Sequence, residues 1–444
     1  ATDPEQSHSL SEQRPTGRFR RWIIGLVLVI GTSVGATLAV TPLVLQVFHS
    51  FPVYTLVANV LADSLLTVAL FFGLCGSVAG LISSTMGAVV MLPAEVCSYL
   101  TLRLAELVAS MPYSTFKVGH LTVPEYAALW GLIACIVWGI RKPGLTSLKA
   151  VAAALCILVV TVTLSSWFSE KPALKVTFLN VGKADAAFVQ PRGSRGILID
   201  GGLRNEHFDS GASIILPFLR WSGNQTVDGM IISHPQMDHM GGLLSVIPQA
   251  RPACIWWNPV QPRPPFVTSI MAEALKVGCQ VLPANRERPV IKLGTATLRF
   301  LNQPCTASHV TPQELNDTSV VCSIRYDNVS FLFTGDMEVM GEEELLASAV
   351  PLAADVLKVG HHGSRTSTSR RFVEAVRPKV AVISSDFRLS RGAPGREVVD
   401  RLLSAGSQVF CTGKDGAVMV ETDGKSLSVS TGKGGPVRWS ITGR

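Results

Sequence analysis

The residues best suited to chemistry lie in one short stretch, His234 to Gly242, which reads His-Pro-Gln-Met-Asp-His-Met-Gly-Gly. An apolar run that predicts a β-strand, Gly229 to Ser233, comes directly before it. Two imidazoles and a carboxylate displayed at the end of a strand are a good ligand set for zinc or manganese. We therefore expect His234, Asp238 and His239 to bind a divalent transition metal.

Three further polar groups follow other predicted strands. Asp200 comes after Gly196 to Ile199, Asp336 comes after Phe333-Thr334-Gly335, and the pair His361-His362 comes after Leu357 to Gly360. α/β folds assemble sites at the ends of buried strands, so this repeated placement predicts that Asp336 and one or both histidines join the same metal site.

On these motifs the chain resembles the metallo-β-lactamase superfamily and, more specifically, the ComEC family of DNA-uptake proteins. The similar segments are Phe178 to Ala186, Leu198 to Gly202, Ser233 to Gly242, Asn316 to Ser319, Thr334 to Asp336 and Leu357 to Ser364, with Thr41 to Phe51 and Ala58-Asn59 in the apolar half. The resemblance implies a membrane α-helical region followed by an α/β metallo-β-lactamase-like αββα sandwich. It also implies a channel for single-stranded DNA.

The resemblance further implies roles for individual residues. Asp238, His239 and the histidine pair would surround one metal ion, with Asp336 bridging to a second ion that keeps His234. In the catalytic scheme Asp238 ligates and His362 protonates the leaving oxygen, while His361 completes the metal site. The resemblance also implies that Asp185, Asp200 and Asn316 contact the ligand side chains rather than the metal.

Several positions depart from the family pattern. Gln236 stands where the family has Asp or His, and a neutral amide oxygen is a poor ligand for a transition metal. Asn180 and Ala393 likewise replace a carboxylate and an imidazole, and His309 is an unfavoured replacement ligand. One ion, or a weak pair of ions, is therefore expected.

Composition places part of the chain in a membrane. Of 444 residues, 47% are apolar and only 16% charged, and the mean hydropathy of +0.34 excludes a disordered chain and an ordinary soluble enzyme. No Lys or Arg occurs between Arg21 and Arg103, whereas charged residues return at normal frequency after Lys171. We expect a polar segment at 1–21, transmembrane helices at 22–170 and a soluble domain at 171–444.

Several apolar runs are candidates for membrane helices. Trp22 to Phe48 and Leu148 to Phe168 predict single spans, and Glu125 to Ile140 a shorter one. Leu61 to Leu92 predicts either one long tilted helix or a hairpin, whose arms would each hold about 16 residues, fewer than the ~20 of a full span. Pro93 to Met111 predicts a separate amphipathic helix, either on the membrane surface or packed as in a soluble protein.

The soluble half alternates short apolar runs with helical patterns, as an α/β domain with mixed sheets does. Strands are predicted at 174–179, 187–190, 196–200, 228–233, 253–257, 296–301, 319–326, 329–334, 356–360, 380–385 and 408–411. Helices are predicted at 213–221, 240–247, 266–276, 337–348, 369–376 and 396–405. We expect Trp256 and Trp257 to pack in the core and the nine cysteines to be buried free thiols.

Charge suggests where a nucleic acid could bind. The segment 355–401 holds ten basic and five acidic side chains, against a net charge of +7 for the whole chain. Such a rim beside a metal could neutralise phosphates, with Lys358, Ser364 and Arg365 as substrate-binding residues, although a scattered solvated face is the simpler alternative.

Two functional hypotheses follow. In the first, an inner-membrane, multi-pass protein of DNA uptake carries a metal-dependent nuclease that degrades the strand that is not imported. In the second, the soluble domain is catalytically impaired and binds or gates DNA. Both predict DNA, membrane lipid and other competence proteins as partners, and neither predicts an oligomeric state. Arg14 to Arg21 and the cluster at 141–149 place those ends in the cytoplasm and the soluble domain outside.

Overall fold

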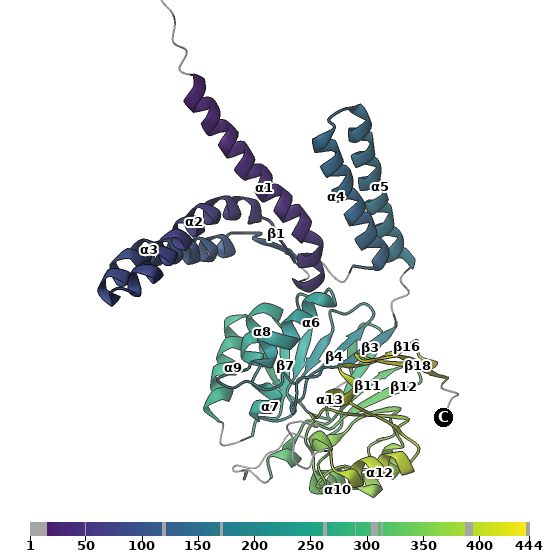
Figure 1. Cartoon of the computed structure of the whole chain (residues 1–444). Coiled ribbons are helices and arrows are strands. Elements are labelled where there is room, and N and C mark those ends of the chain that lie inside the picture. Colours follow the sequence, from purple (N-terminus) through teal and green to yellow (C-terminus); the bar gives the residue numbers. More distant parts are fainter. Residues whose placement is uncertain are drawn as a thin grey trace, which may run out of the picture. The chain divides into compact units, whose positions relative to one another are not determined.

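The computed structural model describes residues 16–48, 50–117, 121–168, 172–260, 264–288, 290–302, 310–311, 314–386 and 394–440. The chain forms two units, at residues 1–167 and 168–444, and each is described by itself (Figure 1).

The first unit is helical. Its elements are α1 (Thr16–Phe48), α2 (Thr55–Gly80), α3 (Ser84–Ser110), α4 (Val123–Arg141) and α5 (Leu145–Phe168), with the short strands β1 (Ser50–Pro52) and β2 (Thr115–Lys117) paired antiparallel. Among the described residues, four helices are long and apolar enough to cross a membrane, namely α2 to α5. The shorter apolar stretch Gly31–Val47 lies in α1, on the predicted first span.

The α2–α3 pair settles the alternatives for Leu61 to Leu92 in favour of a hairpin, because the chain turns between Gly80 and Ser84. The predicted separate helix from Pro93 to Met111 is wrong, since α3 runs without a break through Pro93 to Ser110. Membrane helices tolerate an internal proline because neighbouring groups satisfy the carbonyl that loses its partner. The arms therefore hold 26 and 27 residues rather than the short arms expected from the sequence.

Glycines set how closely the two arms of the hairpin approach. A Cβ added to Gly87 would lie 2.6 Å from the Cα of Gly80, and one added to Gly76 would lie 2.4 Å from Met91 Cγ. Small residues at a helix crossing allow the backbones to touch, which is the main source of packing energy between helices in lipid. The crossing therefore depends on glycine at position 87.

The α4–α5 pair is joined by a buried carboxylate. Glu125 accepts hydrogen bonds from the backbone and hydroxyl of Thr122, the residue that caps α4, and also from the Ser165 hydroxyl of α5. The spans predicted at Glu125 to Ile140 and Leu148 to Phe168 correspond to these two helices, each starting a few residues earlier than predicted.

The second unit contains two sheets within its described residues. In spatial order, the nine-stranded sheet holds β18 (Gly434–Ser440), β17 (Ser426–Thr431), β16 (Val418–Thr422), β3 (Leu174–Phe178), β4 (Ala187–Pro191), β5 (Ile197–Ile199), β6 (Gly229–Ile231), β7 (Cys254–Trp257) and β8 (Gln280–Pro283). The seven-stranded sheet holds β15 (Gln408–Cys411), β14 (Val380–Ile383), β13 (Val356–Lys358), β12 (Val329–Phe333), β11 (Cys322–Tyr326), β10 (Ala296–Phe300) and β9 (Ile291–Leu293).

The sheets pack face to face and helices cover both outer faces (Figure 1). A central core that includes Phe178, Phe331 and Phe333 fills the space between the sheets. The outer helices are α6 (Leu216–Trp221), α8 (Leu243–Ala250) and α9 (Pro265–Lys276) on one side, and α10 (Val339–Ala347), α11 (Arg370–Val376) and α12 (Arg396–Ser404) on the other. This is the αββα sandwich that the sequence predicts.

Some elements differ from the sequence-based expectations. Strands β8, β9 and β16 to β18 were not predicted, because their sequences are short or rich in polar residues. The described cysteines are free thiols, as expected, but only Cys279, Cys322 and Cys411 among them are buried. Cys156 on α5 is exposed, and the other four are partly buried. Cys305 lies outside the described residues. Trp256 and Trp257 are buried in the core, as predicted.

Substituting Gly87→Val should separate the arms of the α2–α3 hairpin, because the new side chain would overlap the backbone of Gly80. In a cysteine-free background, Gly73→Cys with Ala94→Cys reports the packing, since the two Cβ positions lie 4.0 Å apart and suit a disulfide. We expect efficient oxidative cross-linking in the parent and strong loss with Gly87→Val. Gly131→Val, whose Cβ meets nothing within 4 Å, is the control. Equal cross-linking in both variants would contradict the crossing.

Candidate metal centre

The candidate ligands come from the carboxyl ends of strands in both sheets. Asp200 follows β5 and the stretch from His234 to His239 follows β6, its parallel neighbour. Asp336 follows β12 and the pair His361-His362 follows β13, again a parallel neighbour. Because the strands of each parallel pair end at the same edge, the groups from both sheets meet at one end of the sandwich.

Four of these residues form a compact cluster: Asp238, His239, Asp336 and His362, whose ligand atoms all lie within 4.8 Å of one another. Asp336 Oδ2 is 3.2 Å from His239 Nε2 and 3.4 Å from His362 Nε2, and Asp238 Oδ2 is 3.4 Å from His362 Nε2. Ligands about 2.1 Å from a tetrahedral zinc ion would be about 3.4 Å apart, so these separations suit a metal better than direct hydrogen bonds.

Partners on the far side of each ring fix the direction of the two imidazoles. Nδ1 of His239 donates to the carboxylate of Asp200 at 2.9 Å, and Nδ1 of His362 donates to the carbonyl of Ser384 at 2.9 Å. Because carboxylates and carbonyls only accept, Nδ1 carries a proton in both rings, and the Nε2 lone pair faces the cluster when the ring is neutral, as it is in a metal-bound imidazole. This is how proteins orient metal-binding histidines.

The atoms that face the cluster are buried and unsatisfied. Within the described part of the chain, Nε2 of His239 and His362 and Oδ1 of Asp336 have no hydrogen-bonding partner. Nε2 of His234 is also buried without a partner, but this predicted ligand is not one of the four clustered residues. Orphaned buried polar atoms are rare in native proteins, and several converging on one point need a shared partner. Imidazole and carboxylate donors fit zinc or manganese in that place.

The electrostatics of the cluster also suit a cation. Burial opposes the charge of Asp336, but His239 and His362 outweigh burial and hold the pKa of this carboxyl well below its usual range. Burial opposes the charge of Asp238 too, yet the neighbouring His362 and His239 imidazoles lower its pKa to about 2. Burial lowers the pKa of His234 to about 3, so its ring is neutral and can donate a lone pair.

The histidine pair occupies an unusual backbone conformation. His361 and His362 have φ values of 44° and 52°, and Gly363 continues the left-handed run at 77°. Non-glycine residues in this region cost of the order of 1 kcal/mol or more each, and such strain is typical of functional sites. The turn directs the two rings differently: the His362 side chain is 1% exposed and the His361 side chain 28%.

This difference favours the opposite assignment of the pair from the one predicted. His362 belongs to the buried cluster, whereas His361 lies at its mouth with Nε2 4.0 Å from Asp336 Oδ2. Its Nδ1 contacts Glu338 at 2.8 Å. The sequence analysis did not include Glu338 among the site residues. Its place in the sequence, two residues after Asp336, is the signal that could have identified it.

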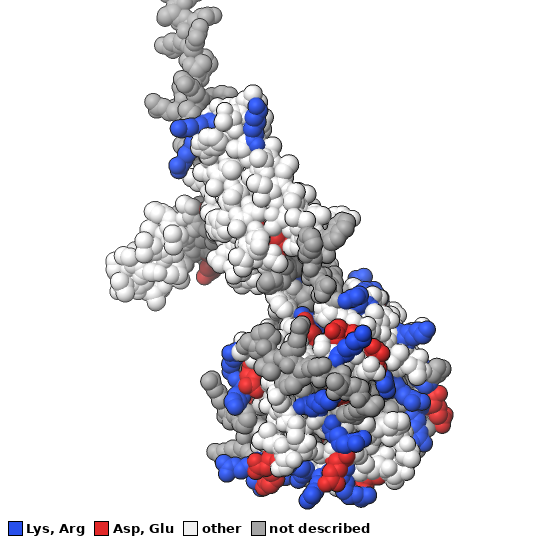
Figure 2. Space-filling model, turned by 90° about the vertical axis from the view of Figure 1, so that its right-hand side faces the viewer, with Lys and Arg blue, Asp and Glu red and all other residues white. Residues whose placement is uncertain are grey.

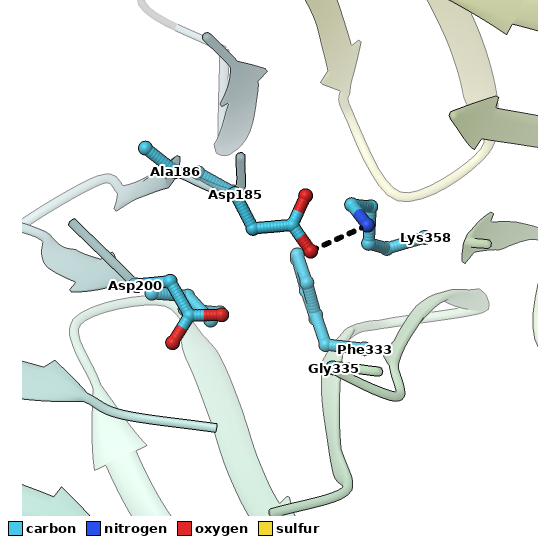
Figure 3. Close-up of a pocket in the computed structure, with 8 residues that line it drawn as sticks. Asp185, Ala186, Asp200, Phe333, Gly335 and Lys358 are labelled. Carbon is cyan, nitrogen blue, oxygen red and sulfur yellow. Dashed lines mark hydrogen bonds and ion pairs between the residues drawn. The ribbon is translucent and has the colours of Figure 1, made fainter. Parts of the chain in front are cut away.

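A buried ion pair lies behind the cluster. Lys358 Nζ is 2.7 Å from Asp185 Oδ2, and both residues line a small cavity together with Asp200, Phe333 and Gly335 (Figure 3). Burial opposes the charge of Asp185, but Lys358 together with His362 and His239 lowers the pKa of the carboxyl. Lys358 is only 5% exposed, so the structure gives it an interior partner rather than the substrate-facing position predicted.

The remaining predicted residues lie around the mouth. Asn316 accepts a hydrogen bond from Gln236 Nε2 at 2.9 Å, and Ser364 lies in the loop after the histidine pair. Arg365 is exposed in the same loop and pairs with Glu397 at 3.2 Å. His309 and Ala393 lie outside the described residues.

The predicted basic rim is largely neutralised where it is described. Ion pairs join Arg370 to Glu374, Arg371 to Glu343 and Lys379 to Asp355, and Arg401 donates to backbone carbonyls. Figure 2 shows basic and acidic side chains interspersed on the face of the α/β unit in view. Arg388 and Arg391 lie outside the described residues. The described part of this segment therefore resembles the scattered solvated face more than a continuous anion-binding surface.

Metal analysis of the full chain in detergent, after supply of zinc or manganese, should find at least one ion per chain. Asp336→Asn should reduce the content sharply, because it removes the charge that faces two Nε2 atoms. His207→Ala, at an exposed imidazole, should leave it unchanged. Near-zero metal in folded parent protein, or equal binding by Asp336→Asn, would rule out this centre.

Comparison with known proteins gives two family matches. The Competence protein family model matches residues 6–143, and the Metallo-beta-lactamase superfamily model matches residues 307–385. ComE operon protein 3 of Bacillus subtilis (strain 168) is 24% identical over 429 residues, which cover 93% of this chain and 53% of that protein. Recombination protein 2 of Haemophilus influenzae is 31% identical over 251 residues, or 56% of this chain and 29% of that protein.

A solved structure, the metallo-beta-lactamase fold protein YhfI from Bacillus subtilis, is 12% identical with a TM-score of 0.37, covering 54% of this chain and 96% of that chain. The chain spans about half the length of ComE operon protein 3. The two family matches agree with the motifs: a segment that matches the Competence protein family model precedes one that matches the Metallo-beta-lactamase superfamily model.

Proposed function

We propose that this chain is part of a multi-pass inner-membrane protein of DNA uptake in natural transformation, and that its α/β domain is a metal-dependent phosphodiesterase. The observation that carries the catalytic part is the set of unsatisfied Nε2 atoms around Asp336. The similarity to competence proteins supports DNA as the substrate. The strand degraded is the one that is not imported, so duplex DNA meets this domain and a single strand enters the membrane. Membrane lipid and other competence proteins are the further partners.

In this proposal Asp238, His239, Asp336 and His362 hold one zinc or manganese ion, and His234 extends the set towards a second. A divalent ion bound there activates water and stabilises charge on the phosphate oxygens. The side chain of Asp238 is 27% exposed, whereas those of His239, Asp336 and His362 are 0–1% exposed, so a phosphodiester approaches from the side of Asp238 and His361.

His361 supplies the proton from its doubly protonated form, in which Nδ1–H faces Glu338 and Nε2–H faces the leaving oxygen. It is the exposed imidazole of the pair, and its Nε2 faces Asp336 across 4.0 Å. As the P–O bond breaks, the leaving oxygen keeps the electron pair and takes the Nε2 proton, while the attacking water forms the new P–O bond and releases a proton to solvent. Ser364 and Arg365 lie in the loop that follows the histidine pair and are placed to contact the neighbouring phosphate.

A second candidate function is a binding or gating module without turnover. The pairing of Gln236 with Asn316 and the neutralised cations of α11 favour it. The two functions differ in whether the purified protein cleaves DNA.

The full chain in detergent, supplied with manganese or zinc, should cleave end-labelled DNA weakly and without sequence preference. Asp238→Ala should abolish cleavage and lower the bound metal, because Asp238 contributes to the cluster. His207→Ala should retain both properties. Cleavage that persists in Asp238→Ala would assign the activity to a contaminant or another site. Metal binding by the parent without cleavage would support the gating module.

The proposed orientation follows from charge and from one strand pair. Arg18 to Arg21 and the cluster at 141–149 should lie in the cytoplasm. Pairing of β1 with β2 holds residues 50–52 and 115–117 together, so α2 and α3 together make an even number of crossings. With one crossing each for α1, α4 and α5, the α/β domain lies outside the cytoplasm.

Labelling with a membrane-impermeant maleimide in intact cells tests this orientation. In a cysteine-free background, Lys276→Cys in the exposed face of α9 should react, and Thr146→Cys beside the basic cluster should react only after permeabilisation. The reverse pattern would refute the orientation, and with it the encounter with DNA before import.

A further inference from the structure

A hydrogen-bonded chain runs along the mouth of the candidate metal centre and ends at Glu338, whose carboxylate contacts His361. Gln236 Nε2 donates to Asn316 Oδ1 at 2.9 Å, and Asn316 Nδ2 donates to Glu338 Oε1 at 3.1 Å. The same carboxylate oxygen is 2.8 Å from His361 Nδ1. Thr366 Oγ1 lies 3.4 Å from the same His361 Nδ1. We call Gln236, Asn316, Glu338 and His361 the mouth relay.

The direction of every hydrogen bond in the mouth relay is set by Glu338. A carboxylate only accepts, so His361 Nδ1 and Asn316 Nδ2 must both be donors. Because Asn316 Nδ2 faces Glu338, Asn316 Oδ1 faces residue 236. The side chain at position 236 must therefore donate a hydrogen bond to that oxygen. Gln236 supplies that donor, whereas the Asp that the family carries at this position could only accept.

The side chain of Glu338 is available because another residue caps the helix that follows it. Asp317 Oδ1 accepts from the backbone N–H groups of Glu338 and Gly341 at 2.8 and 2.9 Å and so holds the start of α10. The loop after the histidine pair is anchored separately, since Glu342 accepts from the backbone of Thr368 and Ser369. Replacing the Glu338 side chain should therefore leave both α10 and this loop in place.

We propose that Glu338, Asn316 and Gln236 are positioning residues for His361. By fixing Nδ1–H towards Glu338, they hold Nε2 towards Asp336 and the approaching phosphodiester. Gln236 is then a functional part of this site rather than a damaged metal ligand. The inference rests on the proposed phosphodiesterase function for its catalytic consequence, while the orientation of the ring is a property of the protein itself.

The orientation is measured first, without reference to activity. The full chain, labelled with ¹⁵N at histidine, reconstituted in lipid and loaded with zinc, gives ring nitrogen shifts that report the tautomer, and His361→Gln assigns the signals. We expect a single tautomer protonated at Nδ1 in the parent and in Glu338→Gln, which keeps an accepting oxygen. Glu338→Ala should show a mixture. An unchanged tautomer in Glu338→Ala would overturn the proposal, whether or not the protein cleaves DNA.

Kinetics on a labelled duplex oligonucleotide then test the consequence. Glu338→Ala should lower kcat about 10- to 100-fold, the range seen when a partner that orients a histidine is removed, with KM and metal content little changed. Glu338→Gln should keep most of kcat. Glu343→Ala, which removes a surface ion pair with Arg371 on the same helix, is the matched control and should resemble the parent.

Substitution at position 236 separates the two interpretations of Gln236. Gln236→Asp should lower kcat, because an accepting oxygen there opposes Asn316 Oδ1. A higher kcat in Gln236→Asp, or an equal loss of kcat in Glu338→Ala and Glu338→Gln, would overturn the positioning role. A parent that shows the expected tautomer but no cleavage would contradict the phosphodiesterase function and leave the orienting contact established.

Discussion

The buried carboxylate of Asp336 is the constraint around which the α/β domain is organised. Its side chain is 1% exposed, and removing such a charge from water is expensive unless opposite charges or donors surround it. His239, which follows β6, and His362, which follows β13, provide these groups. The two strands lie in different sheets. Face-to-face packing of the two sheets is therefore a condition for holding the charge, as well as the source of the hydrophobic core.

A second layer of contacts keeps the imidazoles aimed at that charge. Asp200 and the Ser384 carbonyl fix the buried rings, and the Asp185–Lys358 pair lies behind them. These side chains fit close together because a glycine lets the backbone pass near its neighbours. Gly335, at φ 55°, passes so close to Ser233 and Ser319 that a Cβ would lie within 3.0 Å of both. Any side chain at this position would push Asp336 away from the histidines.

Most residues of the buried cluster could be predicted from the sequence, because strand periodicity and strand ends are local properties. Asp238, His239 and Asp336 could all be named from the residues that precede them. The roles of His361 and His362 could not, because adjacent residues in a left-handed turn point in directions that only φ and ψ determine. Glu338 was missed because its contact with His361 depends on where α10 starts. The continuation of α3 through Pro93 was missed because proline ends helices in water and not in lipid.

The ammonium group of Lys358 acts as a permanent internal counter-ion. Asp185, Asp200 and His239 bring their ligand atoms within 4.8 Å of one another, an arrangement that could otherwise attract a cation. With Lys358 Nζ already 2.7 Å from Asp185, a metal ion entering there would meet a fixed positive charge. The Asp185 carboxylate is thus neutralised by Lys358 during folding itself, before any metal is available. Only the cluster around Asp336 depends on metal supply. Folding of the domain and loading of its centre are therefore separable events.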